Sequence, residues 1–142
     1  MDLAERKKDL LKEIDLIQSI INRMSNTSFL IKGWAITMIS FIFAFRTNQA
    51  VLPLVFIPLF LFWFLDGYFL QQERLYRKLY QWVIENRMTN DSHLFSLNAA
   101  RFGKESIFKA MFSITLGMFY GVTLSLIIVF IFFLWPTVVS NS

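Results

Sequence analysis

Apolar residues near the start of the chain recur at the spacing of a helix that packs against a neighbour. Five of them are separated by four, three, four and three positions: Leu10, Ile14, Ile17, Ile21 and Met24. This heptad spacing places them on one stripe of an α-helix, with charged residues on the other faces. We predict an amphipathic helix over residues 2–27, which either packs against another helix or lies on a membrane surface.

Three later segments are apolar over most of their length. They are residues 28–46, 50–70 and 106–135. A helix rises about 1.5 Å per residue, so each segment is long enough to cross a hydrocarbon core of about 30 Å. We predict a transmembrane helix in each.

A second helical stripe begins in the second apolar segment and runs beyond it. Its members are again separated by four, three, four and three positions: Tyr68, Gln72, Leu75, Leu79 and Trp82. This predicts that the helix continues through residues 71–88. That extension leaves the membrane where residues 2–27 approach it, so we expect the two stripes to pair as an antiparallel stalk.

The remaining segments lack a clear period. Residues 89–105 are predicted to form a loop, and residues 136–142 a short tail. The sequence therefore predicts an all-α fold with three transmembrane helices and a cytoplasmic antiparallel helical stalk.

Composition supports a membrane protein and argues against an enzyme. The chain is 56% hydrophobic, contains 17 Phe, and has no Cys and one His. An apolar excess gathered in long blocks is typical of membrane proteins. Without Cys, and with His93 alone, thiolate and multi-histidine metal sites are excluded. No phosphate-binding glycine loop or hydrolase motif is present, so we expect no catalytic residue, metal or cofactor.

The positive charges predict the orientation in the membrane. All Lys and Arg residues except Arg46 lie on one side of the three apolar segments or at their ends on that side. By the positive-inside rule, the N-terminus and residues 71–105 are cytoplasmic and the C-terminus is external. We expect a multi-pass membrane protein, and the family resemblance given below implies the bacterial inner membrane. The net charge of +4 is mixed in sign, which favours lipid headgroups over a nucleic acid polymer as its partner.

Three charged residues lie inside the apolar segments, about one turn from the cytoplasmic edge: Lys32, Asp66 and Lys109. A carboxylate at that depth is costly unless it is paired. One interpretation is an ion-pair cluster that joins the three helices. The alternative is that the lysines extend to the headgroups and Asp66 marks the boundary.

Small residues recur every fourth position in the third segment: Ser113, Gly117, Gly121 and Ser125. Gly33 lies in the first. Small residues let membrane helices approach closely, either within one subunit or between subunits. Three helices cannot enclose a water path, so a pore would require several copies, and we expect a homo-oligomer.

Basic residues gather beside aromatic rings in the cytoplasmic part: Arg74, Arg77, Lys78, Arg101 and Lys104. Guanidinium groups and stacking rings suit a nucleotide or another phosphate ligand, and the family resemblance given below implies a cyclic nucleotide. The alternative is a basic collar that contacts anionic lipid headgroups.

Two stretches resemble a known family. Residues 23–35 read Arg-Met-Ser-Asn-Thr-Ser-Phe-Leu-Ile-Lys-Gly-Trp-Ala, and residues 66–80 read Asp-Gly-Tyr-Phe-Leu-Gln-Gln-Glu-Arg-Leu-Tyr-Arg-Lys-Leu-Tyr. They resemble the patterns R-M-x-x-N-S-F-x-x-K-G-W-A and D-x-Y-x-L-x-Q-E-R-x-x-R-x-L-Y of small prokaryotic three-span membrane proteins. Thr27 and Gly67 depart from the usual Asn and Ala. Some of these proteins are similar to membrane effectors of nucleotide-signalling antiphage systems of the Panoptes type.

The resemblance implies a membrane-disrupting effector of bacterial antiphage defence that is regulated on its cytoplasmic side by a nucleotide signal or a partner. A structural or regulatory subunit that anchors a cytoplasmic partner is the alternative. A small transporter is disfavoured because the apolar segments contain few polar residues.

Overall fold

The structure is a computed structural model that describes residues 3–44, 49–90, 92, 94–103 and 105–134. Every regular element within these ranges is helical, which confirms the predicted all-α class. In chain order they are α1 (Leu3–Ala44), η1 (Gln49–Val55), α2 (Phe56–Asn86), η2 (Ala99–Phe102), α3 (Ile107–Met111), α4 (Ile114–Val129) and η3 (Phe130–Leu134).

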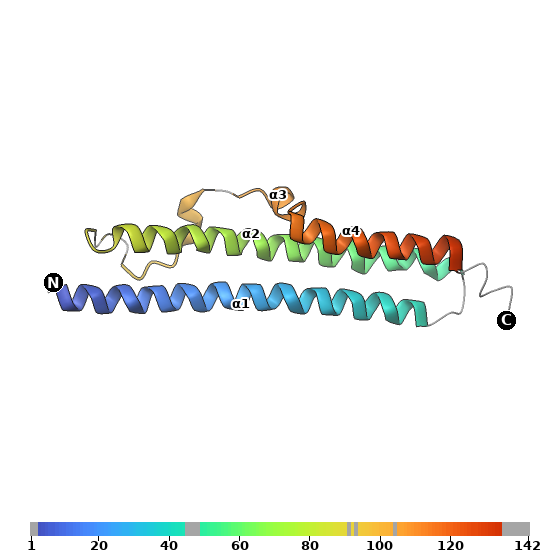
Figure 1. Cartoon of the computed structure of the whole chain (residues 1–142), viewed down its shortest axis with the longest axis horizontal. Coiled ribbons are helices and arrows are strands. Elements are labelled where there is room, and N and C mark those ends of the chain that lie inside the picture. Colours follow the sequence, from blue (N-terminus) through green and yellow to red (C-terminus); the bar gives the residue numbers. More distant parts are fainter. Residues whose placement is uncertain (1–2, 45–48, 91, 93, 104, 135–142) are drawn as a thin grey trace.

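Two long antiparallel helices form the frame of the molecule (Figure 1). Helix α1 contains 42 residues, which corresponds to about 63 Å at 1.5 Å per residue. It includes residues 3–27 of the predicted amphipathic helix and residues 28–44 of the first apolar segment without a break. Helix α2 likewise runs from the second apolar segment into the predicted extension. Both long helices therefore have an apolar half and a polar half.

The polar half consists of α1 up to Thr27 and α2 from Gln71 onward. Its core contains the heptad positions that the sequence indicates, because these are the apolar residues on facing stripes. The buried members are Ile17, Ile21, Leu75, Leu79, Val83 and Ala99. Ala99 comes from the connection between α2 and α3, which packs against the same core.

The apolar half adds α4, which lies along the first part of α2 (Figure 1). Its buried core residues are Ile39, Val55, Leu59, Leu116, Tyr120 and Ile127. Three helical segments are long and apolar enough to cross a membrane: Leu3–Ala44, Leu52–Asn86 and Ile114–Phe133.

The structure interrupts the helix that the sequence predicts over residues 106–135. Helix α3 ends at Met111, and Ser113 has an extended conformation with φ −64° and ψ 153° before α4 begins. Serine favours helix starts because its short polar side chain competes with helical hydrogen bonding. Here the Phe112 and Ser113 amides close the last turn of α3 on Phe108 and Ala110. The predicted span is thus a short helix followed by a longer one.

Candidate functional site

A polar cluster lies where the polar half meets the apolar half. Asp66 of α2 is fully buried, and Lys32 Nζ of α1 lies 2.5 Å from its Oδ2 atom. Ser28 Oγ donates a hydrogen bond to Asp66 Oδ1, and Tyr120 OH of α4 donates one to Oδ2 at 3.3 Å. These four residues, the junction cluster, join the three long helices through one carboxylate.

Local sequence explains how the junction cluster assembles. Ser28 and Lys32 are one turn apart on the same face of α1, and Lys32 Nζ donates to Ser28 Oγ at 2.8 Å. A buried carboxylate is tolerated when its oxygens accept several hydrogen bonds and a cation lies beside it. Asp66 meets both conditions, so the cluster fixes the relative positions of α1, α2 and α4.

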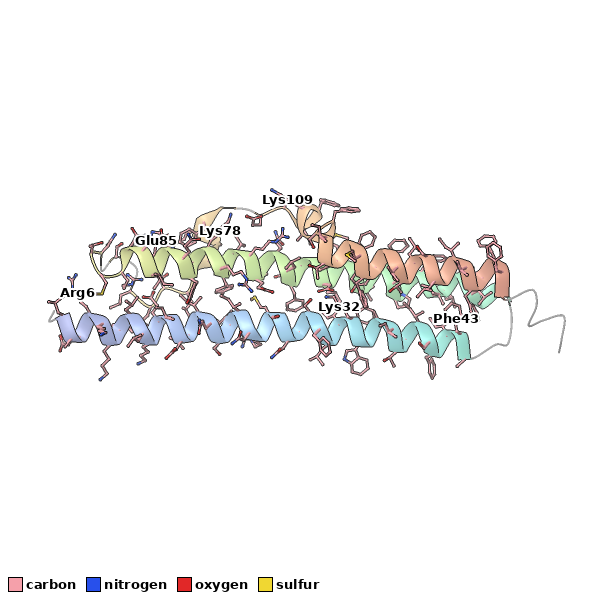
Figure 2. The ribbon with its side chains drawn as sticks, in the orientation of Figure 1. Arg6, Lys32, Phe43, Lys78, Glu85 and Lys109 are labelled. Carbon is pink, nitrogen blue, oxygen red and sulfur yellow. The ribbon has the colours of Figure 1, made fainter. Side chains whose placement is uncertain are left out.

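Lys109 lies elsewhere. It is exposed on α3 and points away from the frame, whereas Lys32 points between α1 and the other helices (Figure 2). The structure therefore brings together two of the three charges that the sequence groups. Ser28 and Tyr120 take the places at Asp66 that Lys109 was expected to fill. The one-turn spacing from Lys32 is a signal for Ser28, but no period distinguishes Tyr120 because α4 is apolar on every side.

The residues of α2 that approach the end of α3 are Trp63 and Gly67, which are close in sequence to Asp66 of the junction cluster. Trp63 Nε1 donates to the Met111 carbonyl at 3.0 Å, which satisfies an acceptor that the end of α3 leaves free. The Trp63 ring also stacks on Tyr120, with centroids 5.9 Å apart. At Gly67 an added Cβ would lie 2.3 Å from Met111 Cγ. Helix α3 can therefore lie this close to α2 only because residue 67 is a glycine.

A second buried ion pair lies at the far end of the polar half, and no pattern in the sequence predicted it. Arg87 Nε and Nη2 donate to the two Glu13 carboxylate oxygens at 2.6 and 2.7 Å. Arg87 is 2% exposed and Glu13 0%. Arg87 Nη1 donates to the carbonyls of Asn90 and Ser92 at 3.2 and 2.8 Å. The pair therefore ties α1, α2 and the start of the connection together.

The expected phosphate-binding residues have acidic neighbours. Arg77 donates from Nε and Nη2 to Glu73 Oε1 at 2.9 and 2.7 Å. Lys78 Nζ lies 2.5 Å from Glu105 Oε1. This hydrogen bond and the positive charge of Lys78 lower the pKa of the Glu105 carboxyl below its usual value. Arg74 lies close enough to Glu105 to contribute in the same direction.

Arg101 has buried donors that make no hydrogen bond to the described residues. Its guanidinium carbon lies 4.1 Å from the ring centroid of Trp82 and 4.8 Å from that of Phe102. Arg101 Nε and Nη2 are buried, and neither has a hydrogen-bond partner in the part of the chain that the structure describes. Lys104 lies outside the described residues, as do residues 136–142 of the predicted tail.

The small residues of α4 are not used for packing inside the protomer. Gly33, Gly117 and Gly121 each have no atom within 4 Å of an added Cβ, outside their own helix and chain neighbours. Ser125 is exposed, and its hydroxyl donates back to the Gly121 carbonyl at 2.9 Å. Ser113 differs, because its Oγ is buried without a partner among the described residues. The stripe from Gly117 to Ser125 faces outward from α4.

Comparisons with protein-family models, with curated proteins and with solved structures find no match for this chain. Over the described ranges, no group of three or more His, Cys, Asp or Glu residues is placed to hold a metal ion. The two buried ion pairs link helices to one another, so the chemistry of these residues is the coupling of helices.

Proposed function

We propose that the chain is a multi-pass protein of the bacterial inner membrane with its polar half in the cytoplasm and its C-terminus outside. Three helices of sufficient length and apolar character support this topology. The Lys and Arg residues support the orientation, because those of the described ranges lie in the polar half or at its junction with the apolar half.

Within that topology, the protein is an effector of antiphage defence that disrupts the membrane when its cytoplasmic half receives a signal. One observation carries the proposal: α1 and α2 continue from the polar half through the apolar half, and one buried carboxylate, Asp66, links both to α4. A change in the packing of the cytoplasmic pair then alters the packing of the three spans. The resemblance of residues 23–35 and 66–80 to effector-like membrane proteins supports the same function.

The signal is a nucleotide or a partner that binds the cytoplasmic half. Arg101 is the strongest candidate for an anionic contact because two of its buried nitrogen atoms have no hydrogen-bond partner among the described residues. Arg77 and Lys78 contribute only if a ligand displaces Glu73 and Glu105. Charge-removing changes at Arg101 should therefore alter regulation more than changes at Arg77.

Membrane potential measured during expression tests the proposal. Induction of the wild-type chain in bacteria should stop growth and depolarise the membrane. Asp66→Asn should abolish depolarisation because Lys32 loses the carboxylate that compensates its charge, and Lys109→Gln, a change of a charged side chain at an exposed position, should not. Membrane abundance is measured for each variant. Normal potential and growth at full wild-type abundance would contradict an effector that acts on expression alone.

The second candidate is a membrane anchor for a cytoplasmic partner. The closed form of the polar half favours it, because Glu13 and Arg87 are buried against each other and the basic residues Arg77 and Lys78 are already paired. An anchor would be recovered with its partner and would leave the membrane potential unchanged.

A further inference from the structure

The two flanks of the polar half are covered unequally. On one flank the connection between α2 and α3 packs against the core through Leu97, Ala99 and Phe102. The other flank holds an open groove of about 490 Å³ between α1 and α2. Its walls include Gln18, Ile21 and Asn22 of α1 and Arg77, Tyr80 and Ile84 of α2. None of the described residues that line the groove belongs to the connection, so we call this side the open flank.

The sequence pattern of the open flank extends beyond the groove. On α1, Leu11 precedes Gln18 by seven residues, and Met88, in the turn after α2 ends at Asn86, follows Ile84 by four. Leu11, Ile84 and Met88 are 54%, 45% and 41% exposed. The flank thus carries exposed apolar side chains beside the stripe that faces the neighbouring helix. In a helix bundle, apolar positions of this kind pack against a further helix.

Charge limits what fits on the open flank. Arg77 is the charged residue among the described groove-lining side chains, and Glu73 binds its guanidinium from the same helix. The pair adds no net charge, so the groove has no excess of positive potential to select an anionic ligand. The groove-lining side chains of two copies would therefore meet without repulsion, through amide, aromatic and aliphatic groups.

We propose that the open flank binds the open flank of a second copy, so that two polar halves form a four-helix bundle around a twofold axis parallel to the helices. The second copy is an assembly partner and not the signal that the cytoplasmic half receives in the proposed function. The proposal requires from that function only that both copies cross the membrane in the same direction.

A shared membrane fixes the register of such a bundle, because equivalent residues of the two copies lie at equal depth. The twofold axis places α1 of one copy against α2 of the other. Within one chain, the contact of Gln18 with Tyr80 shows which residues share a depth. Seven residues toward the tip from this contact are Leu11 on α1 and Arg87 on α2. Leu11 therefore meets the second copy between its Ile84 and Met88, apolar against apolar.

The same register matches the polar positions. Asn22 lies four residues nearer the apolar half than Gln18. The equivalent step from Tyr80 on α2 reaches Tyr76, next to Arg77. The Asn22 amide of one copy would thus lie near Arg77 of the second copy, where an oxygen acceptor suits a guanidinium group. In this register the exposed apolar residues of one copy lie against apolar residues of the other, and the polar residues lie against polar residues.

Disulfide cross-linking tests this interface directly because the chain contains no Cys. Two forms with different tags are co-expressed, one with Leu11→Cys and the other with Ile84→Cys, and native membranes are oxidised. A product that carries both tags should form, since a disulfide requires the two Cα atoms to approach within about 7 Å. The matched control replaces Leu11→Cys by Leu16→Cys, an exposed position on a different face of α1.

The control pair should give several-fold less of the doubly tagged product, although maleimide labelling shows its thiols to be equally reactive. Equal yields for both pairs, or no doubly tagged product, would overturn the interface. A product with one tag and the added mass of a different protein would also overturn it. Cross-linking without depolarisation would contradict the proposed effector function but support the interface. Depolarisation without cross-linking would contradict the interface but support the effector function.

Discussion

Replacing Arg87 by Met would leave the Glu13 carboxylate buried without its cation. Glu13 is 0% exposed and accepts two guanidinium hydrogen bonds, at 2.6 and 2.7 Å. The carbonyls of Asn90 and Ser92 would lose a donor as well. Removal of one partner of a buried ion pair typically costs about 3–5 kcal/mol, because the remaining charge is not compensated. We expect Arg87→Met to destabilise the closed polar half by about 4 kcal/mol.

Hydrogen exchange of the α2 amides near Val83, measured on the protein in lipid nanodiscs, reports this opening. A tenfold change in an opening equilibrium corresponds to about 1.4 kcal/mol, so exchange limited by opening should accelerate by roughly three orders of magnitude. Glu73→Gln is the control, since it breaks an exposed pair worth about 0.3–0.5 kcal/mol. Its exchange should rise by about twofold.

A double variant separates the ion pair from the packing of its side chains. Glu13→Met combined with Arg87→Met removes both charges, and replacement of a buried pair by apolar residues is often close to neutral. The double variant should therefore exchange more slowly than Arg87→Met alone. If Arg87→Met exchanged no faster than Glu73→Gln, the pair would not hold the polar half closed and the reasoning would be refuted.

Two further predictions concern α3 and the connection that precedes it. Gly67→Leu should lower the melting temperature in detergent relative to Gly33→Leu, because only the leucine at position 67 would contact Met111. Overpacking of this kind costs about 1–3 kcal/mol. Equal melting temperatures for the two variants would contradict the close approach of α3 to Gly67. Lys78→Met should lower stability at neutral pH, since the hydrogen bond and positive charge of Lys78 hold the pKa of the Glu105 carboxyl below its usual value. A lowered carboxyl pKa stabilises the fold above the unfolded value and ceases to do so as pH falls through the folded value. The difference between wild type and variant should therefore shrink below pH 4.5, and a difference that persisted there would exclude the ion pair as its cause.

The sequence predicts the long helices well because their apolar residues repeat at a helical period. Ile17, Ile21, Leu75 and Leu79 are all buried where the two stripes meet. Lys32 and Asp66 are likewise recognisable, since charges within apolar segments require partners. Both inferences depend on local composition and spacing, which a single sequence contains.

Contacts between distant segments were harder to predict. Glu13 and Arg87 appear on polar faces of their own helices, and only the register between α1 and α2 brings them together. The interruption at Ser113 is concealed because residues on both sides of it are apolar. Gly117 and Gly121 have the spacing of a packing motif, yet among the described residues of the protomer no other helix lies within 4 Å of a Cβ added at either position.

Fused topology reporters show on which side of the membrane a position lies. They therefore test directly whether the chain crosses the membrane three times with its polar half in the cytoplasm. A dual reporter, active as phosphatase outside and fluorescent inside, is fused after Ser142 or inserted between Thr89 and Asn90 at the tip of the polar half. The account predicts phosphatase activity for the C-terminal fusion and fluorescence for the insertion. Fluorescence from both positions, or the reverse assignment, would contradict it.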